Sequence, residues 1–237
     1  MSVAGVNLPR HLDLIATAPA GVQKLRGLIL ELAVRGKLVP QDPNDEPASE
    51  LLKRIAKERA RLEATGVTRK SAATRPVDED GQPFELPKGW VWGRIADIAN
   101  SQAGFAFKSA AFNEAGIGMP LIRIRDVGFS NPTTFFDGQF RDEFVVAEGD
   151  YLVSMDGQFR VAAWKGPKAL LNQRVSRLQF FGNELAHAFF AASLHIRLAE
   201  LQGVKAYTTV DHLSGAQIAA AVIGIPPLAE QHRIVAG

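Results

Sequence analysis

The 237-residue sequence contains no cysteine, which excludes disulfides, thiolate nucleophiles and cysteine-ligated zinc. Its longest apolar stretches, such as residues 218–225, are far shorter than the roughly 20 residues that a membrane helix needs. The amino terminus also lacks the basic start and apolar run of a signal peptide. We therefore expect a cytoplasmic protein that has no membrane partner.

Motifs for catalysis and metal binding are absent as well. The stretch Asn-Pro-Thr-Thr at 131–134 lacks the second proline and the aromatic residue of an adenine methyltransferase loop, and no Walker loop is present. The histidines show no metal-ligand spacing. Asp211 and His212 beside Ser214 have no nucleophile elbow with which to form a catalytic triad. We expect a chain that is not an enzyme and that binds no metal or cofactor itself.

The bulk composition is that of an ordinary globular protein, with 46% hydrophobic and 22% charged residues. The formal net charge is only +2, so the surface as a whole is not a polycation. A nucleic-acid-binding protein of this composition would need a local basic face.

The first 63 residues form a predicted N-terminal helical segment. Apolar residues at helical spacing predict a helix over residues 22–34, which Gly36 would close. Ser49 would cap a second helix over residues 50–63. The polar side of that helix carries Lys53, Arg54, Lys57, Arg59 and Arg61. We favour a solvated face for these cations, with phosphate contact as the second interpretation.

Residues 64–85 are polar and contain several glycines and prolines, which predicts a flexible linker. Short β-branched and aromatic runs follow and predict the strands 91–94, 121–124, 144–146, 151–155, 161–164 and 177–180. Helices are predicted over 183–201 and 214–221, and a further one begins at Leu228 after two prolines. This mixture predicts an α+β fold with a mixed sheet and flanking helices.

Several motifs occur in a characteristic order between residue 86 and the end of the chain. They are Leu86-Pro87-Lys88-Gly89-Trp90, Gly104-Phe105-Ala106-Phe107-Lys108-Ser109, Met155-Asp156-Gly157, Leu171-Asn172-Gln173-Arg174-Val175 and Pro226-Pro227-Leu228-Ala229-Glu230-Gln231. Together they resemble one target-recognition domain of the DNA specificity subunit of a type I restriction-modification enzyme. Residues 24–40 resemble the end of a conserved helical region of the same family.

The resemblance implies a target-recognition domain over 86–225 and the start of a conserved coiled-coil helix over 226–237. The chain would then be about half of a specificity subunit, either a natural half that pairs with itself as a homodimer or a truncated chain. The end at Gly237, inside a helical stretch, favours truncation.

The resemblance also implies the function and the partners. Such a subunit reads one half of a bipartite target in double-stranded DNA and docks adenine methyltransferase subunits. A motor-nuclease restriction subunit joins the complex, and S-adenosylmethionine, ATP and Mg²⁺ would be bound by these partner subunits.

Three turns offer the hydrogen-bonding groups that read base edges or hold phosphates. The predicted DNA-binding residues are Lys108, Ser109, Gln158, Phe159, Arg160, Asn172, Gln173 and Arg174. Because the family keeps the Asn-Gln-Arg piece across different targets, it would position the domain. Residues 158–160 and the stretch 129–140 are then the better candidates for specificity.

Each of these residues also has a structural interpretation. Phe105, Phe107 and Phe112 fit a core better than base stacking, and Asn172 could satisfy its own turn. Arg174 could form an ion pair with Asp156 or Asp150. Arg123 and Arg125 alternate along a predicted strand, on a side that faces either water or phosphate.

A different class of function is a protein-interaction adaptor that never contacts DNA. The amphipathic helix over 50–63 and the modest net charge permit it. Salt dependence separates the two hypotheses, because phosphate binding weakens steeply as salt rises.

Overall fold

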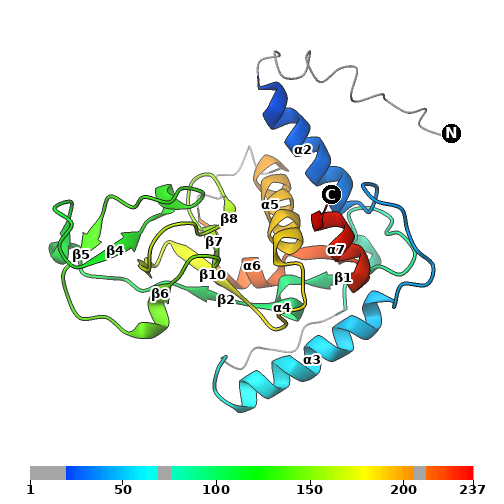
Figure 1. Ribbon diagram of the computed structural model, residues 1–237, viewed down its shortest axis with the longest axis horizontal. Coiled ribbons are helices and arrows are strands. Elements are labelled where there is room, and N and C mark those ends of the chain that lie inside the picture. The colour runs from blue at the N-terminus through cyan, green and yellow to red at the C-terminus, as the bar shows by residue number, and fades with distance from the viewer. Residues whose placement is uncertain (1–19, 69–75, 205–211, 237) are drawn as a thin grey trace.

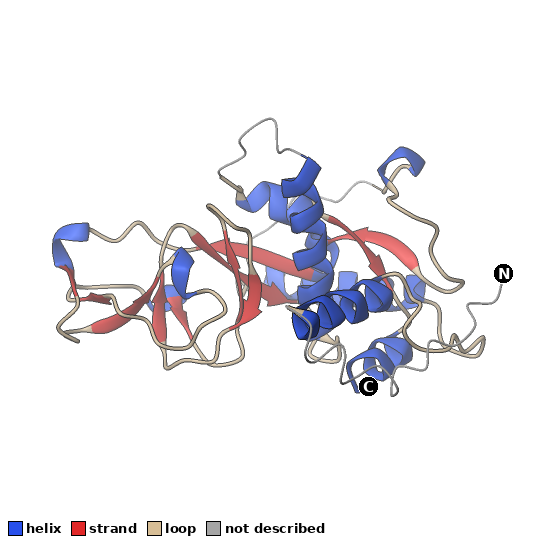
Figure 2. Cartoon of the chain, turned by 90° about the horizontal axis from the view of Figure 1, so that it is seen from above, coloured by secondary structure: helices blue, strands red, loops and turns tan. Residues whose placement is uncertain are grey.

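A computed structural model describes residues 20–68, 76–204 and 212–236. Strands and helices are mixed, which confirms the α+β prediction. Figure 1 shows that the chain is elongated, with the strands β4, β5 and β6 at one end and the helices α2, α3 and α7 at the other. Figure 2 shows the same division from above.

The two N-terminal helices are close to their predicted positions. Helix α2 covers Gly21–Val34, and Gly36 follows it with a φ of 63°. The Lys37 amide donates to the Leu32 carbonyl at 2.8 Å, so glycine closes the helix as predicted. Helix α3 covers Ala48–Ala64 and has Pro47 at its N-cap, so the prediction that Ser49 caps it is wrong.

Helix α3 buries one side and pairs the charges of the other. Leu51 and Ile55 are buried in the main core. On the outer side Lys53 pairs with Glu50 at 2.7 Å and Arg61 with Glu58 at 2.6 Å. These pairs support the solvated interpretation of the basic side, because the cations already have acidic neighbours on the same helix.

The strands form three separate sheets. β1 (Val91–Arg94) pairs antiparallel with β11 (Val222–Ile225). The second sheet has the order β2 (Ala99–Ala103), β10 (Val175–Phe180), β7 (Tyr151–Ser154) and β8 (Val161–Ala163). The third has the order β3 (Phe112–Asn113), β5 (Phe135–Phe136), β4 (Met119–Ile122), β9 (Ala169–Leu171) and β6 (Val145–Val146).

One strand prediction is wrong in a way that matters for two arginines. β4 ends at Ile122, and a 3₁₀ turn, η3 (Ile124–Asp126), follows it. The Asp126 carboxylate accepts a hydrogen bond from the Arg123 amide at 2.8 Å, which starts the turn. Arg123 and Arg125 therefore do not alternate along a strand, although both are exposed.

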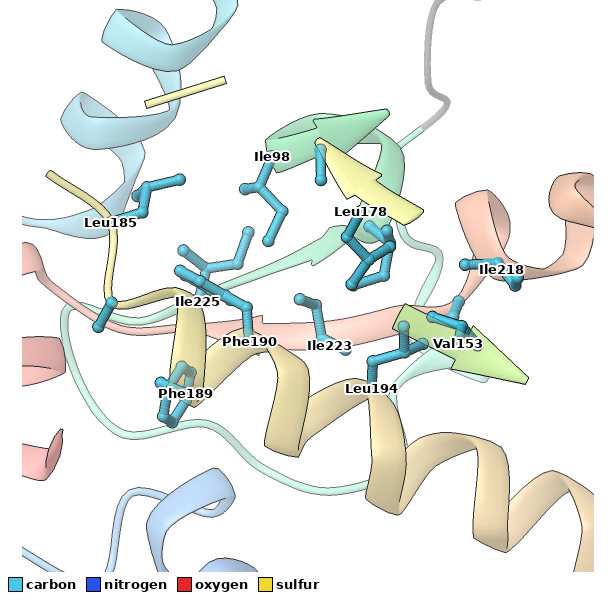
Figure 3. Close-up of a cluster of buried hydrophobic side chains, with 14 of the residues drawn as sticks. Ile98, Val153, Leu178, Leu185, Phe189, Phe190, Leu194, Ile218, Ile223 and Ile225 are labelled. Carbon is cyan, nitrogen blue, oxygen red and sulfur yellow. The ribbon is translucent and has the colours of Figure 1, made fainter. Parts of the chain in front are cut away.

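The main core lies around α5 (His187–Val204), which the sequence predicted over 183–201. Figure 3 shows Phe190 and Leu194 of this helix directed toward Ile223 and Ile225 of β11. The core also includes Leu51 of α3. It thus runs across the predicted boundaries at residues 63 and 85, which themselves stay predictions.

The end of the predicted linker is packed rather than free. The rings of Phe84 and Trp92 meet edge to face with their centroids 4.9 Å apart. The Arg35 guanidinium lies 5.3 Å from the centre of the Phe84 ring. Residues 69–75 of the predicted linker lie outside the described residues.

The C-terminal helix α7 (Leu228–Ala236) begins at Leu228 as predicted and is fixed by a buried carboxylate. Glu230 is 1% exposed. It accepts hydrogen bonds from Trp90 Nε1 at 2.9 Å and from Gln41 Nε2 at 2.7 Å. Burial raises the pKa of Glu230, and these two hydrogen bonds and the charge of Arg233 oppose the rise in part.

Replacing Glu230 with glutamine is expected to change how stability depends on pH. Because the folded-state pKa is raised above the ordinary value of 4.5, the contribution of Glu230 to stability is full below that value. It is lost as pH rises through the folded-state pKa. As pH rises from 4.5 toward neutral, the free energy of unfolding of the wild type should therefore fall relative to that of Glu230→Gln, which has no carboxyl group to titrate at this position.

Thermal unfolding of both proteins across this pH range measures the difference. The same change at the exposed Glu148 controls for the loss of one carboxylate. A constant difference between wild type and Glu230→Gln at every pH would contradict the prediction.

Candidate nucleic-acid interface

Two of the three predicted turns are joined through their backbones. The Phe105 amide donates to the Leu171 carbonyl at 2.9 Å, and the Gln173 amide donates to the Phe105 carbonyl at 3.0 Å. Phe105 and Asn172 form an isolated parallel β-bridge. The start of the loop 104–109 is thereby fixed against residues 171–173, whereas Lys108 and Ser109 lie at its far end, next to η2 (Ser109–Ala111).

The remaining turn, at residues 155–160, is joined to the turn at residues 171–174. The Met155 amide donates to the Arg174 carbonyl at 3.0 Å. The Arg174 guanidinium also forms an ion pair with Asp156 at 3.3 Å, which confirms the structural interpretation of Arg174. The three turns thus form one continuous cluster, which we call the recognition turns: residues 104–109, 155–160 and 171–174.

His212 belongs to this cluster, and sequence reasoning missed it. Its Nδ1 lies 2.6 Å from the Asp156 carboxylate and 3.1 Å from the Arg174 guanidinium. Ser214 is not a nucleophile aligned with this histidine, because its side chain caps α6 (Gly215–Ala220) by accepting the Gln217 amide. Arg174 and His212 together place two nitrogen-bearing side chains on an exposed surface.

Most of the predicted side chains are available to a ligand. The exposed ones are Lys108, Ser109, Gln158, Gln173 and Arg174, and Arg160 is half-buried. Arg160 donates to the Gln158 side chain at 3.0 Å, so these two residues are presented as a pair. The cluster therefore offers amide and guanidinium groups suited to base edges, together with Lys108 as a point charge.

Two predicted DNA contacts are not supported. Phe159 is 4% exposed and packs in the main core, so its ring is not available to a base. Asn172 is 7% exposed, and its side-chain oxygen accepts the Arg174 amide at 3.3 Å. Asn172 thus stabilises its own turn, as the structural interpretation proposed.

The aromatic residues of the first turn have different roles. Phe107 is buried in a small core with Phe136 and Phe144, and Phe112 packs against that core. Phe105 is exposed, but its ring contacts those of Phe107 and Phe144 with centroids 5.2 Å apart in each case. The core interpretation is confirmed for Phe107 and Phe112 and holds in part for Phe105.

No group of three or more His, Cys, Asp or Glu side chains that could hold a metal ion occurs in the described part of the chain. None of its helices, within residues 20–68, 76–204 and 212–236, is long and apolar enough to cross a membrane.

Comparison with known proteins gives consistent matches. Residues 87–237 match the family model described as the type I restriction modification DNA specificity domain. The specificity subunit of the type I restriction enzyme EcoAI of Escherichia coli is 32% identical over 246 residues, which cover 96% of this chain and 41% of that subunit. The EcoEI specificity subunit of Escherichia coli is 62% identical over 79 residues, 33% of this chain and 13% of that subunit.

A solved chain shows the same fold at low identity. It comes from a study of complex assembly and conformational transition in the type I R-M system and matches with a TM-score of 0.50 and 19% identity. The match covers 92% of this chain and 48% of the solved one, so the chain spans less than half the length of these relatives. On the strength of the family model and the fold, the chain belongs to the type I restriction modification DNA specificity domain family.

Proposed function

We propose that this chain is a non-catalytic DNA-recognition unit that reads one half of a bipartite target. The observation that carries the proposal is the cluster of three turns, which backbone bonds and the Arg174–Asp156 pair hold together and which carries exposed amide and guanidinium groups. Asn and Gln pair with adenine and Arg pairs with guanine, so these groups suit readout in the major groove.

The proposed partners are double-stranded DNA, adenine methyltransferase subunits and a motor-nuclease restriction subunit. S-adenosylmethionine, ATP and Mg²⁺ would be bound by those subunits. Membership of the specificity family supports this assignment. If two copies pair as a homodimer, the target should be an inverted repeat, because two-fold protein symmetry imposes symmetry on the site.

Replacing Gln158 with alanine is expected to relax the methylated motif at one base position. A directed side-chain contact to a base contributes about 1–3 kcal/mol of discrimination, which corresponds to roughly 5- to 150-fold. Gln173→Ala should instead lower methylation at all sites alike if residues 172–174 position the domain. The measurement is a map of methylated adenines in cells that co-express the chain with the methyltransferase encoded beside its gene.

The matched control is Gln82→Ala, which removes an exposed glutamine outside the recognition turns. Its map should equal that of the wild type. A wild-type map without any sequence motif would contradict DNA recognition and favour the protein-interaction adaptor.

A further inference from the structure

A groove lies between helix α2 and the sheet that contains β8. Its volume is about 1070 Å³. Arg26 and Leu30 of α2 line it, together with the three residues of β8 and with Lys165, which follows that strand. Several residues of the stretch 125–133, which follows β4, complete the lining.

The groove concentrates positive charge. Arg26, Arg125 and Lys165 line it and are all exposed. Arg26 and Lys165 form no ion pair with any residue of the described ranges. Hydrogen bonds from Arg125 to Thr133 at 3.2 Å and Thr134 at 3.0 Å hold its guanidinium in place. This cationic excess is local, since the whole chain carries a formal charge of only +2.

The one carboxylate in the lining is already engaged. Asp126 is buried and accepts the Arg123 amide at 2.8 Å. Burial raises the pKa of Asp126, and the hydrogen bond from Arg123 and the charges of Arg125 and Arg123 oppose the rise in part. Arg125 lies 4.0 Å from the Asp126 carboxylate, whereas Arg26 and Lys165, which have no ion pair within the described ranges, can bind an anionic ligand.

The groove continues into the recognition turns. Phe129, at 60% exposure, lines it, and the Arg160 guanidinium lies 5.7 Å from the centre of the Phe129 ring. Arg160 in turn binds Gln158. An extended anion in the groove would thus end beside the side chains that we propose to contact bases.

We propose that this groove holds the DNA phosphate backbone next to the bases that the recognition turns read. This inference rests on the proposed function. Unpaired Arg and Lys side chains bind phosphates without regard to sequence and fix the register of a protein on the duplex. Arg26 of α2 and Lys165, which follows β8, would both contact the backbone. A phosphate track that adjoins the readout surface favours nucleic acid over an acidic protein segment.

The test is the salt dependence of duplex binding by the whole chain, measured by fluorescence anisotropy with a labelled duplex that contains the methylated motif. Arg26→Ala and Lys165→Ala should each reduce the slope of log K against log salt by about 0.9, and the double variant by about twice that. Lys57→Ala, an exposed lysine on α3, is the control and should leave the slope unchanged. All of these positions are exposed, so thermal unfolding should stay as in the wild type.

The outcomes separate the groove from the proposed function. If the wild type binds DNA and the groove variants keep its slope, the groove is not the phosphate site but DNA recognition stands. If the wild type does not bind the duplex, the proposed function itself fails. Binding of a polyglutamate peptide in place of the duplex would assign the groove to an acidic protein partner and overturn the inference.

Discussion

Replacing Gly104 with alanine is expected to separate two of the recognition turns and to abolish sequence-selective methylation. A Cβ atom at this position would overlap the carbonyl oxygens of Leu171 and Asn172. Both obstacles are backbone atoms, and the β-bridge between Phe105 and Asn172 holds them in place. They cannot move aside as the end of a flexible side chain could, so we expect a cost of about 1–3 kcal/mol or more.

The measurement pairs the methylation map with thermal unfolding. Gly81→Ala is the matched control, because within 4 Å its added Cβ would meet, among the described residues, only a Val77 methyl group at 3.5 Å, which is an ordinary contact. Gly81→Ala should methylate the wild-type motif at the wild-type level. A Gly104→Ala protein that did the same would show that the joining of the two turns is unnecessary for recognition.

Much of the fold follows from local patterns in the sequence. Apolar spacing predicts α2 and α3, and the helix α5 differs from its prediction only at its ends. The short strands are different: β3 and β5 have two residues each, too few to show an alternation. The strand β9 is set by pairing with β4 and β6, far away in the sequence, and no local signal specifies it.

The same limit applies to the candidate site. The motifs locate the recognition turns, but the burial of Phe159 depends on α5, whose Gln202 donates to the Gly157 carbonyl at 2.7 Å. His212 reaches Asp156 across 56 residues. Arg26 and Lys165 line one groove although they are far apart in the sequence. These features need tertiary structure, since nothing in the local sequence marks them.

Replacing Phe190 with alanine is expected to have the largest effect on stability. Phe190 is 0% exposed, and its ring lies 5.3 Å from that of Phe189 and 6.4 Å from that of Phe180, centroid to centroid. Removing a buried phenylalanine ring costs about 3–5 kcal/mol. For a chain of this size that should lower the melting temperature by roughly 6–20 °C.

The matched control is Phe129→Ala, the same change at an exposed position, which should alter stability by about 0.5 kcal/mol or less. Phe190→Leu keeps part of the buried side chain and should lose less stability. Its melting temperature therefore tests the prediction even if Phe190→Ala does not fold. Equal losses of stability in Phe190→Ala and Phe129→Ala would show that packing of α5 does not stabilise the core.

The consequence of Phe190→Ala should extend beyond stability, because α5 packs against both α2 and β8. Those two elements both contribute residues to the lining of the basic groove. A loosened α5 would therefore let Arg26 and Lys165 move relative to each other, and the salt slope of DNA binding should fall even though no phosphate-binding side chain has been removed. Arg26→Ala should lower that slope without lowering the melting temperature. The salt slope and the melting temperature of the two variants together distinguish the loss of a phosphate contact from the loss of the packing that positions that contact.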